Sequence, residues 1–238
     1  MIWMFAGSGL TKLALAAGGA ALLSGPLDNP DTWVVGHTPY MPPAATRLFY
    51  TANARSVKVA HQKGIVVDLE RWPYTPRGQQ AHPVMAYRQA SAWAMQHGHW
   101  LMAAPAMDLV RSVRPGYRDK IYPEFVRLHL AQKIATYVQV YEIQAQGAER
   151  NPALYRRFVS EIAAQVRAGN PKARILAGLS TNPDGKSVSV SVLYRDVQET
   201  RGIVSGYWLN IPQAGVACPR CGQAMPEIAV RLVDRVGR

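Results

Sequence analysis

The chain has 238 residues, of which 48% are hydrophobic and 18% are charged, so it carries enough apolar material for one sizeable core. Its formal net charge of +12 favours acidic partners such as nucleic acid, anionic glycans or anionic lipid. The cations are spread along the chain, however, without helix-turn-helix, RNP or zinc-finger spacing. We therefore expect no specific nucleic-acid site and interpret most Arg residues as solvated helix faces.

The first 26 residues contain an apolar run at 13–23 (LALAAGGAALL), with Lys12 before it and SGP after it. This run has the length of a signal-peptide core and is short for a membrane span, which needs ~20 apolar residues. We expect residues 1–26 to be an export signal or, alternatively, an uncleaved N-terminal anchor. The folded domain would then comprise residues 27–238, and the protein would be secreted or held in the cell envelope.

Short β-like runs alternate with helical runs along the rest of the chain. We expect strands at 32–35, 47–51, 65–70, 100–105, 137–146, 174–179 and 203–211, and helices at 83–96, 123–135, 152–168, 191–199 and 226–236. This alternation predicts βα units on a parallel sheet. A single-domain α/β fold, a compact or incomplete (β/α) TIM-type barrel, is the first choice, because the length is near its short limit of ~200 residues. A doubly wound open sheet is the alternative, although no GxGxxG or Walker loop is present.

Ligands of parallel βα folds bind at the carboxyl ends of the strands, where this chain places acids, amides and aromatic residues. The clearest strand ends in Asp68 and Glu70, which share one face and lie ~6.6 Å apart at Cα. The strand at 137–146 places Glu142, Gln144 and Gln146 on one face. Trp72 follows the same strand as Asp68 and Glu70, and three other strand ends contribute the remaining candidates, which are Asp108, Asn182, Trp208 and Asn210.

Carboxylates suit acid/base chemistry, amides bind hydroxyl groups, and indole rings stack on the apolar face of a sugar. The combination predicts a carbohydrate site in which Glu70, Asp68 and Glu142 are catalytic. Glu70 would be the general acid, with a pKa raised by Asp68, and Glu142 the second carboxylate of a retaining or an inverting mechanism. The amides and aromatic residues, with Asp108, would bind substrate. Helix capping, ion pairing and core packing are the structural alternatives for each of these residues taken alone.

Two cysteines, Cys218 and Cys221, lie in the segment ACPRCG. In an exported protein, a disulfide that closes this short loop is the simplest interpretation. Half a zinc site and a redox CxxC are the alternatives, but no His or Cys cluster lies nearby, and a thioredoxin-type CxxC opens a helix near the start of its domain. We expect neither a metal nor a cofactor.

The segments DLERWPYTPRGQQAHP, WLMAAPAMDL, YEIQAQ, ILAGLSTNP and GYWLNIP resemble, in this order, an uncharacterised group of secreted bacterial proteins with a βα-barrel. The chain is also loosely similar to chitinase-type glycoside hydrolases, whose catalytic strand ends in a proton-donating Glu with an Asp two residues before it. Asp68 and Glu70 match these two acids, whereas Val66 replaces an earlier acid of that series. The resemblance implies that Trp208, by its strand position, floors a sugar subsite.

Two functions follow from these patterns. The first is a secreted glycoside hydrolase, acting as a monomer on a polysaccharide or glycan, anionic ones included. The second is a barrel that binds a glycan or cell-wall polymer without cleaving it, which Val66 and the basic charge favour. A nucleic-acid or membrane-surface protein that acts through charge alone is a third interpretation, in which the strand-end residues have no special role.

Overall fold

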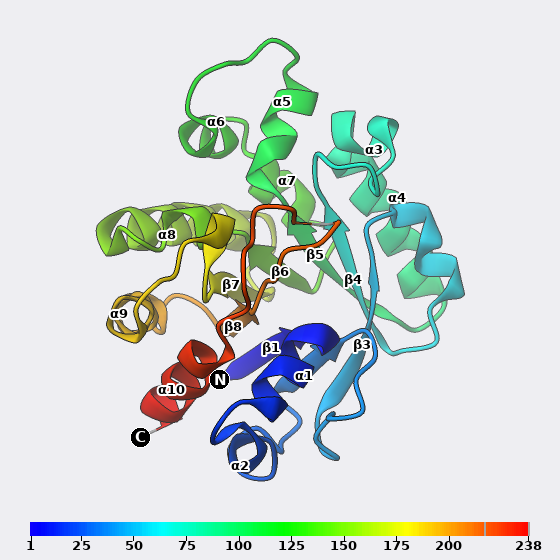
Figure 1. Ribbon diagram of the computed structural model, residues 1–238. Helices are drawn as coiled ribbons and strands as arrows, with labels where there is room; N and C mark the ends of the chain where they lie inside the picture. The colour runs from blue at the N-terminus through cyan, green and yellow to red at the C-terminus, as the bar shows by residue number, and fades with distance from the viewer. Residues whose placement is uncertain (217, 238) are drawn as a thin grey trace. The chain divides into compact units, whose positions relative to one another are not determined.

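The computed structural model describes residues 1–216 and 218–237, so positions 217 and 238 of the predicted domain lie outside the described residues. Its eight strands are parallel neighbours in chain order and form a closed barrel. The strands are β1 (Ile2–Ala6), β2 (Thr32–Val35), β3 (Thr46–Thr51), β4 (Gly64–Leu69), β5 (Trp100–Pro105), β6 (Val140–Ile143), β7 (Arg174–Ser180) and β8 (Gly206–Asn210) (Figure 1). The TIM-type α/β barrel is thereby confirmed, in its closed form, and the open doubly wound sheet is excluded.

Helical segments connect the strands. The α-helices are α1 (Gly7–Leu15), α2 (Gly19–Leu23), α3 (Arg77–Ala81), α4 (Pro83–Gln96), α5 (Val110–Val113), α6 (Ile121–Arg127), α7 (Leu130–Ala135), α8 (Pro152–Gly169), α9 (Val190–Thr200) and α10 (Pro226–Gly237). The 3-10 helices are η1 (Ala54–Val59), η2 (Met107–Leu109), η3 (Gln146–Ala148) and η4 (Pro183–Gly185). No helix of the described residues is long and apolar enough to cross a membrane.

The chain divides into two compact units. One comprises Met1–Arg47, Ala145–Arg157 and the chain from Ala177 onward, and the other comprises Leu48–Gln144 and Phe158–Leu176. The first unit, called the terminal unit below, contains β1, β2 and β8. The second, called the central unit, contains β4, β5 and β6 together with helices α3 to α7.

The N-terminal segment differs most from the sequence-based prediction. Ile2–Ala6 is the barrel strand β1, which pairs in parallel with β2 and with β8. The apolar run then forms α1 and α2, whose Leu10, Leu13, Leu22 and Leu23 are buried. The predicted domain boundary at residue 27 is therefore wrong, because this segment is a buried βα unit of the barrel. A buried βα unit and a signal peptide both contain an apolar run, which is why the sequence at 13–23 suggested an export signal.

The central unit is organised around β4, which is buried along its whole length, as parallel strands usually are. Its first residue must be glycine, because a Cβ on Gly64 would lie 2.2 Å from the ring of Trp100. The register then places Asp68 beside Ala104 of β5. The next strand, β6, is shorter than predicted and ends at Ile143, so the amide of Gln144 lies just beyond it.

Candidate active site

Asp68 is a buried acid near the carboxyl end of β4, with 6% of its surface exposed. The phenol of Tyr50 donates a hydrogen bond to its Oδ2 at 2.9 Å. Tyr50 lies on β3 beside Val66, and side chains alternate along a strand, so Tyr50 and Asp68 share one face of the sheet. Gln144 donates to the other carboxyl oxygen, Oδ1, at 2.9 Å. Each oxygen of Asp68 therefore accepts a hydrogen bond, which favours its ionised form.

The amide of Gln144 has a fixed orientation. Its Nε2 donates both to Asp68 and, at 3.1 Å, to the carbonyl oxygen of Ala104. Because a carbonyl oxygen can only accept, the amide nitrogen must face this side and cannot exchange places with the amide oxygen. The carbonyl oxygen of Ala104 in β5 therefore determines that Gln144 presents its amide nitrogen, and not its amide oxygen, to Asp68.

Glu70 is the first residue after β4, and its backbone is held by the loop that follows. Its N–H donates to Oγ1 of Thr75 at 3.2 Å. The same hydroxyl accepts the indole N–H of Trp72 at 2.8 Å. The partly exposed ring of Trp72 also lies edge-on to Tyr74, with the ring centroids 5.1 Å apart. The loop that carries Glu70 is therefore cross-braced through the buried Thr75.

The two acids of β4 have unequal proton affinities. Burial raises the pKa of Asp68 to about 7, while the hydrogen bonds from Tyr50 and Gln144 act in the opposite direction. Burial, together with the negative charges of Asp68 and Asp108, raises the pKa of Glu70 to about 8. When two such acids share a proton, the group with the higher pKa holds it. While the pair holds a single proton, Glu70 is therefore its preferred site, since Asp68 accepts two hydrogen bonds that favour its ionised form.

The third predicted carboxyl group lies two strands away. Ala103 of β5 pairs with Tyr141 of β6. Continuing this register places Glu142 beside Ala104, which pairs with Asp68 on its other side. Residues separated by one intervening strand lie ~9.6 Å apart at Cα.

Glu142 is fully buried, and neither of its carboxyl oxygens has a hydrogen-bond partner among the residues that the structure describes. Burial holds its pKa well above the ordinary value, and the charges of Asp68 and Glu70 add to this effect. Both effects favour the neutral form of Glu142. A neutral acid is poorly suited to the role of base or nucleophile.

Asp108 joins the same electrostatic cluster from η2. Its Oδ1 accepts the backbone N–H of Arg71 at 3.0 Å. Burial raises its pKa, whereas this hydrogen bond and the charges of Arg71 and Arg111 lower it. The contact ties the loop after β4 to the loop after β5.

Within the described ranges, no three His, Cys, Asp or Glu side chains lie close enough to hold a metal ion.

Six of the predicted site residues belong to the central unit. Its electrostatic and hydrogen-bond network contains Asp68, Glu70, Asp108, Glu142 and Gln144, and Trp72 belongs to the adjoining loop. Sequence reasoning missed Tyr50, because it considered only acids, amides and indoles at the strand ends. A tyrosine one residue before the end of the predicted strand 47–51 was the available signal.

The other four predicted residues, Gln146, Asn182, Trp208 and Asn210, belong to the terminal unit. Asn182 is fully buried, and its Nδ2 donates to the carbonyl oxygens of Cys221 at 2.7 Å and Gln223 at 2.9 Å. Trp208 is a buried residue of β8. Asn210 accepts the backbone N–H of Thr181 through its carbonyl oxygen, and Gln146 begins η3. Substrate binding by these four residues stays a prediction.

The two cysteines form a disulfide between Cys218 and Cys221, with their Cα atoms 5.4 Å apart. The disulfide confirms that part of the sequence-based prediction. The hydrogen bond from Asn182 to the carbonyl oxygen of Cys221 anchors the disulfide loop to the segment after β7.

No protein-family model matches the chain, and no curated protein matches it. Among solved structures, the chain is similar to the catalytic domain of a family GH18 chitinase from the fern Peteris ryukyuensis, with 17% sequence identity and a TM-score of 0.44. The match covers 85% of this chain and 72% of that chain. The similarity is a loose one.

Proposed function

We propose that the protein is an exported or envelope glycoside hydrolase that cleaves a glycan by acid catalysis at Glu70. One observation supports the proposal: the acids at the end of β4 are unequal, because hydrogen bonds from Tyr50 and Gln144 favour the ionised form of Asp68 and the charges of Asp68 and Asp108 favour the protonated form of Glu70. Glycosidic cleavage needs such a pair, one carboxyl to protonate the leaving oxygen and one carboxylate near the developing positive charge.

In the proposed reaction, Glu70 gives its proton to the glycosidic oxygen while the bond from that oxygen to the anomeric carbon breaks. The sugar ring becomes positively charged, and the carboxylate of Asp68 stabilises that charge in a site that excludes most water. A water oxygen then bonds to the anomeric carbon, and one proton of that water returns to Glu70. Glu142 is given no role as base or nucleophile in this reaction, because burial favours its neutral form.

Export is supported by the disulfide, because disulfides persist in oxidising compartments. Export of this fold would have to leave residues 2–6 in place, since they form the barrel strand β1.

A glycan-binding barrel without turnover is the second candidate. Val66, which is fully buried, favours it, because the chitinase-type acid series has a carboxylate at that position. The two candidates share the site and differ only in whether the proton of Glu70 is transferred.

The test is turnover of aryl glycosides and soluble polysaccharides by the wild type, Glu70→Gln and Glu161→Gln. Glu161 is an exposed acid of α8 and serves as the matched control. General acid catalysis contributes ~10²–10⁴-fold, so we expect Glu70→Gln to lower kcat/KM by about that factor while glycan affinity persists. Glycan binding without any turnover by the wild type would favour the binding barrel. Turnover unchanged by Glu70→Gln would contradict the proposed mechanism.

A further inference from the structure

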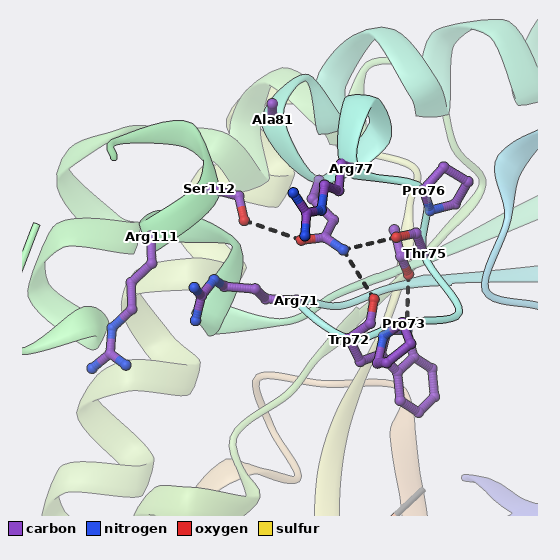
Figure 2. Close-up of a pocket in the computed structure, with 10 residues that line it drawn as sticks. Arg71, Trp72, Pro73, Thr75, Pro76, Arg77, Ala81, Arg111 and Ser112 are labelled. Atoms are coloured by element: carbon purple, nitrogen blue, oxygen red, sulfur yellow. Dashed lines mark hydrogen bonds between the residues drawn. The ribbon is translucent and has the colours of Figure 1, made fainter. Parts of the chain in front are cut away.

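A pocket of about 760 Å³ in the central unit begins one residue after Glu70. The loop after β4, helix α3 and helix α5 line it, and they bring in the guanidinium groups of Arg71, Arg77 and Arg111. Figure 2 shows the side chain of Arg71 extending toward the helix that carries Arg111 and Ser112. We call this the arginine pocket.

The arginine pocket carries a surplus of positive charge. All three arginines are exposed, and none forms an ion pair within the part of the chain that the structure describes. The charges of Arg71 and Arg111 lower the pKa of the nearby Asp108. The Oδ1 of Asp108 already accepts the backbone N–H of Arg71. Three arginines and no acidic residue line the pocket, so it is complementary to a negatively charged ligand.

The floor of the pocket is held by one buried amide, that of Gln80. Its Nε2 donates to the carbonyl oxygens of Trp72 at 2.9 Å and Thr75 at 2.7 Å. Its Oε1 accepts the hydroxyl of Ser112 at 3.2 Å. The dashed lines in Figure 2 follow these contacts, which join the loop, α3 and α5. A ligand would therefore meet a pocket wall that is already ordered, which reduces the entropy cost of binding.

The size and the side chains of the pocket indicate the class of ligand. Its volume lies within the ~300–1,000 Å³ that is usual for small-molecule sites, enough for a sugar unit. Guanidinium groups bind planar or tetrahedral oxyanions through paired hydrogen bonds. The partly exposed indole of Trp72 offers an apolar surface of the kind that packs against a sugar ring.

We infer that the arginine pocket binds the carboxylate or sulfate group of a sugar unit, and that the substrate is an anionic polysaccharide. The pocket and Glu70 share one short loop, so the charged unit lies close to the bond that Glu70 protonates. The inference rests on the proposed function for the nature of the polymer. A phosphodiester backbone has the same charge, but the acid pair beside the pocket favours a glycan.

Calorimetric binding of three probes tests the inference: an oligogalacturonate, the same oligosaccharide with its carboxyls methyl-esterified, and a sulfated chondroitin oligosaccharide. The variants are Arg77→Gln and Arg111→Gln, with Arg88→Gln as the matched control, since Arg88 is an exposed arginine of α4 outside the pocket. We expect at least one anionic probe to bind about tenfold or more tightly than the ester. Each pocket variant should weaken that binding by about tenfold or more and leave the ester unaffected, whereas Arg88→Gln should change neither. The carboxylated and sulfated probes together show which oxyanion the pocket prefers.

Equal affinity for the acid and its ester, no binding of either anionic probe, or an equal loss with Arg88→Gln would each overturn the inference. Tighter binding of duplex DNA than of either anionic oligosaccharide, weakened by the pocket variants, would overturn it as well, because the pocket would then be a phosphate site.

Turnover is measured separately. Anionic probes that bind in the pocket but are never cleaved would contradict the proposed function alone, and cleavage of neutral glycans with no preference for anionic ones would contradict this inference alone.

Discussion

Tyr50 donates a hydrogen bond to Oδ2 of Asp68 at 2.9 Å from the neighbouring strand β3. This contact stabilises the charged form of Asp68 and lowers its pKa, whereas burial raises that pKa. The proposed catalysis therefore depends on a residue that does not itself exchange a proton with the substrate.

We predict that Tyr50→Phe narrows the pH range of activity. In the proposed mechanism, activity rises as Asp68 ionises, near its pKa of about 7, and falls as Glu70 loses its proton, near its pKa of about 8. Without the phenol, the pKa of Asp68 rises, and the acidic limb of the profile should move to higher pH by about one unit. The measurement is kcat/KM against pH for Tyr50→Phe and for Tyr40→Phe, which changes an exposed tyrosine. Identical profiles for Tyr50→Phe and the wild type would show that Tyr50 does not stabilise the ionised form of Asp68.

We predict that Asp196→Asn stabilises the protein at alkaline pH. Asp196 of α9 is fully buried, neither carboxyl oxygen has a hydrogen-bond partner among the described residues, and burial raises its pKa to about 8. The folded state then binds a proton that the unfolded state has lost, so stability falls as the pH rises from about 4 to about 8.

The measurement for Asp196 is the thermal midpoint of wild type and variant across this pH range. The advantage of Asp196→Asn should be absent below pH 4, should grow with pH, and should level off above pH 8. Glu227→Gln, at an exposed acid of α10, is the control and should show no such trend. A wild type whose stability does not fall relative to Asp196→Asn would show that Asp196 ionises normally.

We predict that Asn182→Ala destabilises the terminal unit. The Nδ2 of Asn182 donates to the carbonyl oxygens of Cys221 and Gln223, and the side chain is fully buried. Leaving the buried carbonyl group of Cys221 without its donor costs ~1–3 kcal/mol, which denaturant unfolding should detect. If Asn182→Ala instead left stability unchanged and weakened glycan binding, the predicted substrate-binding role would be supported over the structural one.

We predict that the chain starting at residue 27 does not fold cooperatively. Removing residues 1–26 deletes β1, which pairs with both β2 and β8, and opens the barrel at that point. Circular dichroism during thermal unfolding should show no cooperative transition for the truncated chain. A truncated chain that unfolded like the full one would restore the domain boundary predicted from the sequence.

Local sequence signals predicted some elements to the residue. β5 at Trp100–Pro105 and α4 at Pro83–Gln96 have the predicted bounds, because Pro83 starts the helix and Gly98, with φ of +74°, follows its end. The predicted helix 123–135 instead breaks into α6 and α7 at His129, whose left-handed backbone (φ 51°) no residue pattern indicated.

The parts that failed depend on pairing between distant segments. Alternation along one strand correctly placed Asp68 near Glu70, but the contact from Tyr50 depends on the register between β3 and β4, which composition does not reveal. β1 was missed for a similar reason, because only its pairing with β8 distinguishes it from an apolar leader. Neutral Glu142 likewise follows from complete burial, which strand parity alone does not predict.

An NMR titration of ¹³C-labelled side-chain carboxyl groups would show whether the pair of acids holds its single proton on Glu70, as the proposed mechanism requires, or on Asp68. The two signals are assigned by their absence in Glu70→Gln and Asp68→Asn. We expect Glu70 to titrate near pH 8 and Asp68 to titrate below it. A Glu70 signal that titrates near the ordinary value of 4.5 would contradict the mechanism, because Glu70 would then be ionised at neutral pH and could not protonate the leaving group.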